Sequence, residues 1–312
     1  MLLVALLAAL AALPAACSAQ PEVSAAPSSG DAVAPSGAAD AADVGARAGS
    51  GSDWSHVLQV VANVKAAPPA KPLVILLGGS AARESTISDR SWRTQIVAKG
   101  GPAAAVYNLG SSNRTLAQNV AIVKALPEGA SERPTIVYIG VNLGSFTRAQ
   151  KTARISLPRP DTPLPAYQQH HYSQKRILTA ANKRMLVKAW LTDRYPTFKR
   201  NFNSSAGVLD ELIATCKSRG LHPVLFELPR NTAIIGHKLD APTKRYRDKC
   251  RALARKHGIP YVNLVAQARL RSRAFYDLWH LIEPGRKVWQ NLLSARTATL
   301  LKKYGETDAA GT

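Results

Sequence analysis

The sequence predicts an α/β protein in which helices cover both faces of a doubly wound parallel sheet. Two observations lead to this prediction. Short apolar segments alternate with amphipathic helical segments between residues 53 and 305, and such alternation is typical of parallel sheets. Residues 145–202 interrupt the alternation, because they contain no strand pattern and are rich in Lys and Arg. We therefore expect a three-layer α/β/α domain with a basic helical insertion after its third strand.

Five strands are expected from runs of apolar residues, at residues 72–78, 104–110, 135–141, 222–229 and 259–265. Each of the last two strands is preceded by an amphipathic helix. A first helix is expected to begin near Asp53, and a final helix to lie between Pro284 and Gly305, since Pro is favoured where helices begin and Gly where they end. In sheets of this type ligands bind at the carboxyl ends of the strands. Polar residues at these ends are therefore the candidates for a functional site.

The first 17 residues, MLLVALLAALAALPAAC, form an apolar stretch that ends in small residues. The stretch is short for a membrane span and resembles the apolar core and cleavage region of a secretory signal. We expect a signal peptide at residues 1–19, with lipidation of Cys17 and cleavage after Ala19 as alternatives. Residues 20–52 are expected to form a disordered linker, and residues 306–312 a flexible tail. This interpretation places the protein in the periplasm or outside the cell.

Basic residues dominate the charge of the chain. The 41 Lys and Arg residues and 20 Asp and Glu residues give a formal net charge of +21, which attracts polyanions. Nucleic acid is not the expected partner, because the protein is predicted to be exported and no recognition motif accompanies the basic residues. A basic segment after the third strand would lie over the carboxyl edge of the sheet. It is either a solvated face or, as we expect, a guide for an anionic polymer or membrane surface, contacted by Lys183, Arg184 and Lys188.

Cys216 and Cys250 lie on the apolar faces of two predicted helices. They are either small buried hydrophobic residues or, in an oxidising compartment, partners in a disulfide. Neither these cysteines nor the consecutive residues His170 and His171 are accompanied by the further ligand residues that a metal site requires. We expect no metal and no organic cofactor.

Four polar segments stand out: GGSAARES (78–85), YNLGSSNRT (107–115) and YIGVNLGSF (138–146) at the ends of the first three strands, and FYDLWHLIEPG (275–285) before the last helix. Each alone is common. Their order resembles the four sequence blocks of the SGNH, or GDSL, hydrolase superfamily, over about residues 70–303. The resemblance implies a flavodoxin-like sheet and the hydrolysis of esters.

The resemblance implies that Ser80, His280 and Asp277 form a catalytic triad. A serine hydroxyl becomes a strong nucleophile only when a base takes its proton. His280 would be this base, and Asp277 would orient the imidazole and stabilise its charged form.

The resemblance also implies an oxyanion hole, in which hydrogen-bond donors stabilise the tetrahedral intermediate. The donors would be the backbone N–H of Ser80, a backbone N–H of the second block, from Gly110 or Asn113, and the side chain of Asn142. In the second block the family's glycine aligns with Asn113 rather than with Gly110, and Asn tolerates turn geometry better than most residues. Gly140 would let the chain turn tightly beneath Asn142.

The sequence around Ser80 departs from the family pattern. Gly79 stands where an acidic residue is usual, and Ala81 replaces the usual Leu. A Gly-Ser pair with a nearby Arg resembles a branch of the superfamily that includes envelope acyltransferases. Arg83 is expected either to bind substrate at the site or to form a solvated pair with Glu84.

The favoured function is a serine esterase that removes an acyl group from a carbohydrate or other polymer of the cell envelope through an acyl-enzyme. An O-acyltransferase would use the same residues and exclude water. A non-catalytic envelope-binding protein would keep the fold, and Ser80 would then be only the N-cap of the next helix.

Overall fold

The computed structural model describes residues 52–130, 133–160, 164 and 169–310. The predicted signal peptide with Cys17, and almost all of the predicted linker, lie outside the described residues. Within the part of the chain that is described, no helix has the length and apolar character of a membrane span.

A five-stranded, wholly parallel sheet forms the centre of the domain, with the strand order β2-β1-β3-β4-β5. The strands are β1 Leu73–Gly78, β2 Ala105–Gly110, β3 Thr135–Val141, β4 His222–Glu227 and β5 Tyr261–Asn263. The first strand, β1, lies inside the sheet, and β2 forms one edge beside it. Strands β3, β4 and β5 then follow in order on the other side of β1. The predicted three-layer α/β/α fold is confirmed.

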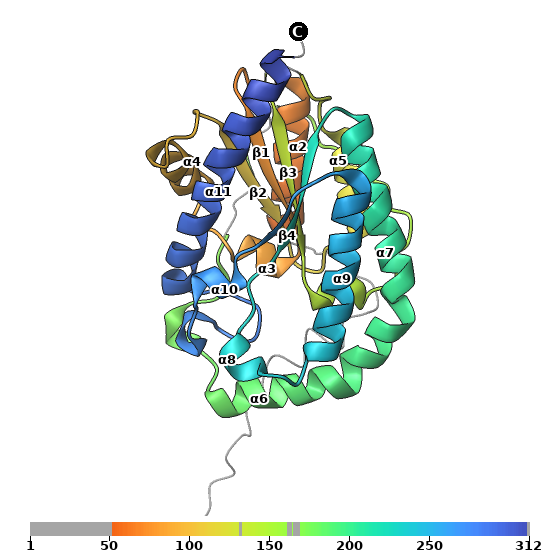
Figure 1. Cartoon of the computed structure of the whole chain (residues 1–312), viewed down its shortest axis with the longest axis vertical. Helices are drawn as coiled ribbons and strands as arrows, with labels where there is room; N and C mark the ends of the chain where they lie inside the picture. Colours follow the sequence, from red (N-terminus) through yellow and green to blue (C-terminus); the bar gives the residue numbers. More distant parts are fainter. Residues whose placement is uncertain (1–51, 131–132, 161–163, 165–168, 311–312) are drawn as a thin grey trace, which may run out of the picture.

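Helices cover both faces of this sheet (Figure 1). One face packs against α2 Ser52–Ala66, α5 Leu116–Ala125, α7 Tyr195–Ser218 and α9 Asp240–His257, and the other against α4 Asp89–Ala98 and α11 Glu283–Ala310. Short helices lie at the carboxyl edge or in loops: α3 Ser80–Arg83, α8 Thr232–Ile235, α10 Val265–Ala268 and η4 Ser272–Ala274. Helix α11 continues beyond Gly305, its predicted end, because this glycine does not adopt the left-handed conformation that ends many helices.

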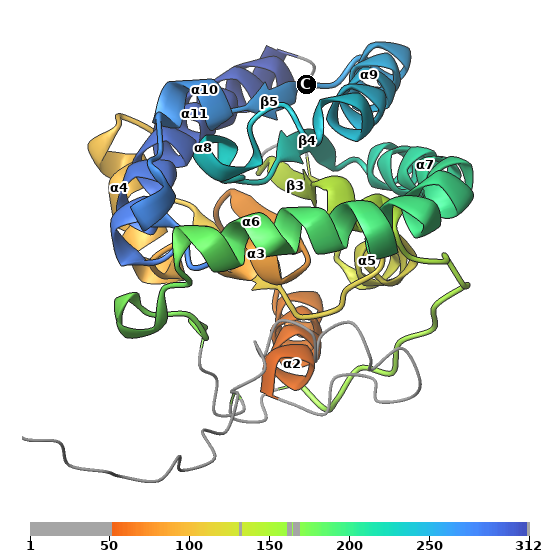
Figure 2. The same cartoon turned by 90° about the horizontal axis from the view of Figure 1, so that it is seen from below.

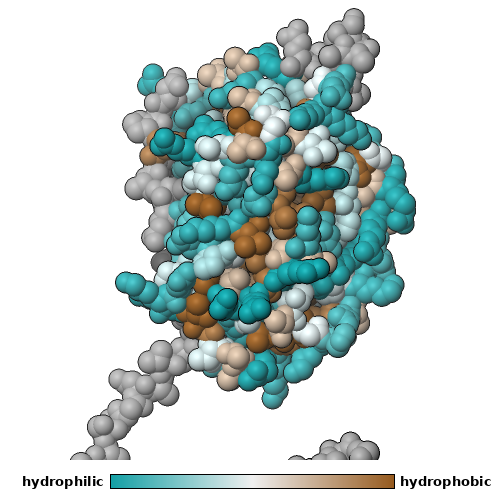
Figure 3. Space-filling view, turned by 60° about the vertical axis from the view of Figure 1, so that its left-hand side comes forward, coloured by the Kyte–Doolittle hydropathy of each residue, from teal (hydrophilic) through white to brown (hydrophobic). Residues whose placement is uncertain are grey.

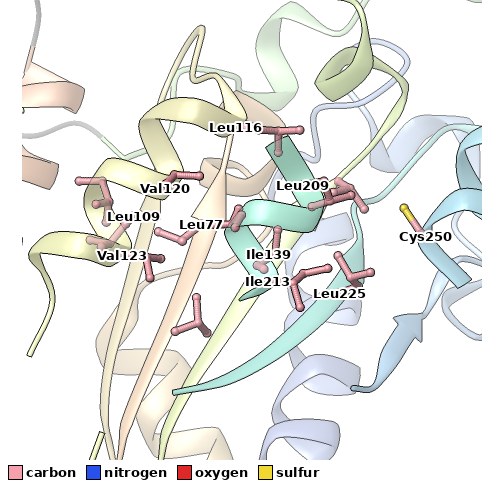
Figure 4. Packing of buried hydrophobic residues seen from close by; sticks show 14 of the residues in the cluster. Leu77, Leu109, Leu116, Val120, Val123, Ile139, Leu209, Ile213, Leu225 and Cys250 are labelled. Carbon is pink, nitrogen blue, oxygen red and sulfur yellow. The ribbon is translucent and has the colours of Figure 1, made fainter. Parts of the chain in front are cut away.

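The core has two halves, because alternate strand residues face opposite layers. Leu77 of β1 packs with α5 and α7, whereas its neighbour Leu76 packs with α4 and α11. Figure 4 shows the first half, where strand residues such as Leu77 and Ile139 meet Val120 of α5 and Leu209 of α7. Burying one such side chain contributes about 1.5–3 kcal/mol. The two halves together hold the strand ends, and thus the candidate site, in fixed register.

The outer surface of α4 and α11 is less polar than the charge of the chain suggests. Apolar side chains lie between hydrophilic ones on this face (Figure 3). Val97 of α4 is 52% exposed and Val288 of α11 is 42% exposed. This face therefore combines exposed apolar side chains with its polar ones.

The basic segment predicted as an insertion does not form a separate unit. It contains η1 Leu143–Phe146, η2 Gln174–Arg176, α6 Ala180–Ala189 and the π-helical turn Trp190–Arg194, which leads directly into α7. Residue 202, its predicted end, lies within α7, where Phe202 stacks on Phe146. Helix α6 crosses below the carboxyl edge of the sheet (Figure 2). The segment is thus anchored in the core at its end and spans the edge where the strands finish.

Cys216 and Cys250 are both free thiols and both fully buried in the core. The disulfide alternative is wrong, and the interpretation as small buried hydrophobic residues is confirmed. Burial raises the pKa of the Cys216 thiol to about 12 and raises the pKa of Cys250 as well, because the charged thiolate loses its hydration.

We predict that Cys216 and Cys250 of the folded protein resist alkylation by iodoacetamide, since the thiolate is the reactive form. Both should react fully after unfolding in guanidinium without a reductant. Peptide mass mapping measures each thiol separately from Cys17. Protection that persists in non-reducing guanidinium and disappears with a reductant would reveal a disulfide and contradict the structure.

Candidate active site

Ser80 lies at the sharp turn between β1 and the short helix α3. Gly79 occupies the N-cap position, and its carbonyl accepts a hydrogen bond from Ala82 N at 2.9 Å. Ser80 is therefore the first helical residue, and its Oγ lies 2.8 Å from Nε2 of His280. The alternative in which Ser80 is only the N-cap is wrong, because the cap position belongs to Gly79. The N–H of Ser80 lies in the first turn, where backbone donors have no partner within the helix.

Helix α3 packs very closely on the ends of the strands. A Cβ atom on Gly110 would lie 2.3 Å from the backbone nitrogen of Arg83, and one on Gly78 would lie 2.7 Å from Cβ of Ala82. The N–H of Gly110 already donates to Asn108 Oδ1 at 3.0 Å. The prediction that Gly110 contributes an oxyanion donor is therefore wrong, and this glycine instead permits the close approach of α3.

The histidine lies on a hairpin formed by residues 274–282. Its two arms are joined by Tyr276 N with His280 O at 2.9 Å and by Ile282 N with the carbonyl of residue 274 at 3.1 Å. Asp277 organises the turn, because its Oδ1 accepts from the backbone N–H groups of Trp279 and His280, both at 2.8 Å. Its Oδ2 lies 2.7 Å from Nδ1 of His280. Asp277 thus stabilises the turn of the hairpin and also pairs with the imidazole of His280.

The electrostatics of this pair favour a charged imidazole. Burial alone would lower the pKa of His280, but the charge and hydrogen bond of Asp277 outweigh it and the pKa is raised. Burial alone would raise the pKa of Asp277, but His280 and the two backbone N–H groups lower it. Because Asp277 accepts from Nδ1–H, Nε2 of the neutral ring is the acceptor for the Ser80 hydroxyl. His280 is only 8% exposed.

The two predicted asparagines occupy special backbone positions. Asn113 has a positive φ of 59°, so it adopts the turn geometry that the alignment requires, and its side-chain oxygen accepts from Arg148. Asn142 is the N-cap of η1: its Oδ1 accepts from Ser145 N at 3.2 Å, and its own N–H donates to Ser145 Oγ. The cap uses the amide oxygen alone. Among the described residues the Nδ2 group has no hydrogen-bond partner, which agrees with its predicted role as a donor.

Gly140 does not make the tight turn that was expected of it. It lies within β3, where an added Cβ would be 2.8 Å from the carbonyl oxygen of Leu77 and 2.9 Å from Leu228 Cδ2. It is fully enclosed by neighbouring chain. The requirement for glycine therefore comes from strand packing beneath the site.

Arg83 is 1% exposed, so the expectation of a solvated pair with Glu84 is wrong. Its guanidinium binds Asp53, Glu84 and Ser112 Oγ, the last at 2.7 Å. Arg286 of α11 binds the other oxygen of Glu84. Burial tends to raise the pKa of Asp53, but Arg83 and the N–H of Ser112 hold it below its usual value. Arg83 thus belongs to a buried ion network, so its guanidinium is not exposed to bind substrate as the other expectation required.

Lys183 is also buried, at 1% exposure, which contradicts its predicted role on a basic surface. From α6 its Nζ donates to the carbonyl oxygens of Ser272 at 2.9 Å and Phe275 at 2.8 Å. Burial lowers its pKa, although nearby Asp277 opposes the shift. Its helical spacing from the apolar Val187 and Trp190 is the sequence signal that could have placed it on the inner face.

Two further residues contact the hairpin, and sequence reasoning did not assign either to the site. Asn231 donates from Nδ2 to the carbonyl oxygen of Asp277 at 3.1 Å. Tyr172, from the segment before α6, stacks on the ring of His280 with 4.4 Å between centroids. Nothing in the local pattern around Tyr172 indicates this contact. Within the described residues, no group of three or more His, Cys, Asp and Glu is placed to hold a metal ion.

No protein-family model and no curated protein sequence matches the chain. Several solved structures are similar. A lipase/acylhydrolase from Enterococcus faecalis is 13% identical, with 73% of this chain and 96% of that chain covered and a TM-score of 0.40. A member of the lipolytic G-D-S-L family from Veillonella parvula is 11% identical, with coverages of 72% and 97% and a TM-score of 0.42.

A catalytic mutant of an acetylxylan esterase from Geobacillus stearothermophilus is 12% identical, with coverages of 73% and 95% and a TM-score of 0.42. The function proposed below rests on the side chains of the site.

We predict that Lys183→Met lowers the free energy of unfolding by about 1–3 kcal/mol, because two buried carbonyl groups lose their donor. The matched control is Arg184→Gln, the exposed neighbour on α6, which should change it by less than about 0.5 kcal/mol. Urea unfolding followed by circular dichroism measures both. Equal stability of the two variants would show that the Lys183 contacts do not hold α6 to the hairpin.

Proposed function

We propose that the protein is a serine hydrolase that cleaves ester-linked acyl groups. One observation carries the proposal: an unbroken hydrogen-bonded series joins Ser80 Oγ to His280 at 2.8 Å and His280 to Asp277 at 2.7 Å. A nucleophile within about 2.6–3.2 Å of a base, with a third group that orients the base, is the arrangement that activates a serine. The raised pKa of His280 supports this, since the imidazole then holds a proton readily.

The mechanism follows from the geometry. Ser80 Oγ attacks the ester carbonyl while its proton passes to Nε2 of His280, and Asp277 stabilises the imidazolium that forms. The N–H of Ser80 and the Nδ2 group of Asn142 would donate to the oxyanion, and one such donor contributes about 2.7–4 kcal/mol to catalysis. His280 then gives its proton to the departing alcohol, and the acyl group remains on Ser80 as an acyl-enzyme. Water attacks the acyl-enzyme while His280 takes its proton. His280 then returns this proton to Ser80 Oγ, and the carboxylic acid is released.

The proposed substrate is an acylated carbohydrate or another polymer of the cell envelope, which the protein would meet after export. Support comes from the apolar N-terminal residues and from the net charge of +21. Arg184 and Lys188 are exposed on α6, the helix that crosses the carboxyl edge of the sheet (Figure 2). They would attract an acidic polymer toward the site.

The test is intact mass spectrometry of the full chain after treatment with a fluorophosphonate. One adduct should form on the wild type and on Ser218→Ala, which removes an exposed serine of α7, and none on Ser80→Ala. His280→Ala should react at least about 100-fold more slowly, because the general base is lost.

Absence of an adduct on folded wild-type protein would reject the hydrolase and favour the non-catalytic envelope-binding protein. If Ser80 reacts, incubation of an acetylated glycan with and without an acceptor sugar separates hydrolysis from transfer. Free acetate as the main product with the acceptor present indicates an esterase, and acetylated acceptor indicates an O-acyltransferase.

We also predict that Arg184→Gln/Lys188→Gln weakens binding to polygalacturonate at low salt by about 3- to 10-fold, the effect of losing two exposed charge pairs. The control Arg90→Gln/Lys99→Gln removes the same charge from the α4 face and should have a smaller effect. Fluorescence anisotropy of labelled polymer measures both. Equal effects would show that net charge, rather than α6, attracts the polymer.

A further inference from the structure

The segment of residues 169–178, which precedes α6, attaches to the chain just after α3. His170 Nε2 lies 2.7 Å from the carbonyl oxygen of Thr86. The backbone N–H of His171 donates to Glu84 Oε1 at 3.0 Å. These contacts fix the 169–178 segment to the element that begins with Ser80.

The same segment also attaches to the hairpin that carries His280. Leu178 N donates to the carbonyl oxygen of Tyr276 at 3.2 Å. The ring of Tyr172 stacks on His280 at 4.4 Å with 28° between the planes, and lies 4.5 Å from the ring of Tyr276. One face of the imidazole is therefore covered by a residue that is distant in sequence from both Ser80 and the hairpin.

A buried ion pair holds the backbone around Tyr172. Glu84 and Arg286 bind one another, and neither is exposed to more than a few per cent. Glu84 accepts from His171 N at 3.0 Å, and Arg286 donates from Nη2 to the carbonyl oxygen of Tyr172 at 3.0 Å. Because the two partners of the pair bind the backbone of the adjacent residues His171 and Tyr172, the position of the Tyr172 ring is set from its backbone.

We propose that Tyr172 is a positioning residue whose ring holds the His280 imidazole in the orientation that presents Nε2 to Ser80 and Nδ1 to Asp277. Its role in catalysis rests on the serine hydrolase function proposed above. A ring stacked on one face opposes rotation of the imidazole out of this plane. The electron-rich face of a phenol also attracts a cation, so it favours the imidazolium that forms when Ser80 gives up its proton.

Other groups near His280 also affect the pKa of its imidazole. Asp277 and Glu84 favour the charged imidazole, whereas burial and Arg83 oppose it. The titratable and charged groups around the ring and its partner Asp277 are Tyr276 and Asp277 on the hairpin, Arg83 and Glu84 at α3, Lys183 on α6 and Arg286 on α11. Replacement of Tyr172 by an apolar side chain keeps all of these charged and titratable groups. A change in the pKa of His280 therefore reports on the loss of the Tyr172 ring.

The experiment compares Tyr172→Leu, which keeps apolar volume without an aromatic face, with Tyr172→Phe, which keeps the ring. NMR titration of the full chain with isotope-labelled histidine measures the pKa of His280. The pH dependence of the fluorophosphonate labelling rate measures the pKa of the general base that activates Ser80. Neutral His280 is the active form, so labelling falls as the pH drops through its pKa. Loss of the ring destabilises the imidazolium and lowers that pKa.

For Tyr172→Leu we expect the pKa and the acid limb of labelling to move down by about 0.4–1.5 pH units, the range that a cation–ring contact provides. At pH values above this limb the labelling rate should fall several-fold, because the His280 imidazole is no longer held in its orientation. Tyr172→Phe should keep the wild-type pKa. Urea unfolding of both variants verifies that they fold.

A Tyr172→Leu pKa equal to that of the wild type, or a reduced rate without a pKa shift, would overturn the proposal, since a structural defect alone gives the latter. A Tyr172→Phe pKa that moves with that of Tyr172→Leu would also overturn it. The NMR titration does not require reactivity. If the wild type fails to label while the pKa shift is observed, the hydrolase function fails and the contact of Tyr172 with His280 stands.

Discussion

The candidate site depends on a buried ion pair that joins its two parts. Glu84 follows the short helix that begins with Ser80, and Arg286 lies in the first turn of α11, just after the hairpin with His280. Both charges are buried, and loss of one partner from a buried pair typically costs about 3–5 kcal/mol. The pair therefore sets how closely the serine and the histidine approach. It also fixes the segment that brings Tyr172 to the imidazole.

Much of the fold was predictable because it follows from local patterns. Apolar runs that alternate with amphipathic helices predict a parallel sheet with two covered faces. All five strands lie within two residues of their expected limits, and β1, β2 and β3 lie within one. The order of the polar segments was sufficient to select Ser80, His280 and Asp277, which the structure brings together. Of these three, only Ser80 closely follows a strand. His280 and Asp277 lie on the hairpin before α11, and they were selected because the order of the segments resembles that of a known superfamily.

The rest depended on tertiary contacts that the charge of a residue and the order of the motifs do not reveal. Arg83 and Lys183 were expected in solvent because most charged side chains are, yet both are enclosed with partners from other elements. Gly110 was interpreted as a donor, although the close approach of α3 explains it. Tyr172 lies in a Pro-rich stretch without periodicity, so no pattern connects it with His280. In each case the deciding contact is made by residues far away in sequence.

The separation of Ser80 and His280 along the chain has a consequence for how the protein acquires its site. Their hydrogen bond spans 200 positions, and Arg286 belongs to the final helix. Contacts of such long range form late and slowly, because the intervening chain must first be ordered. A partly synthesised or partly folded chain therefore has no assembled serine–histidine pair. The candidate site is therefore complete only when α11 docks, since Arg286 on this helix binds Glu84 beside α3.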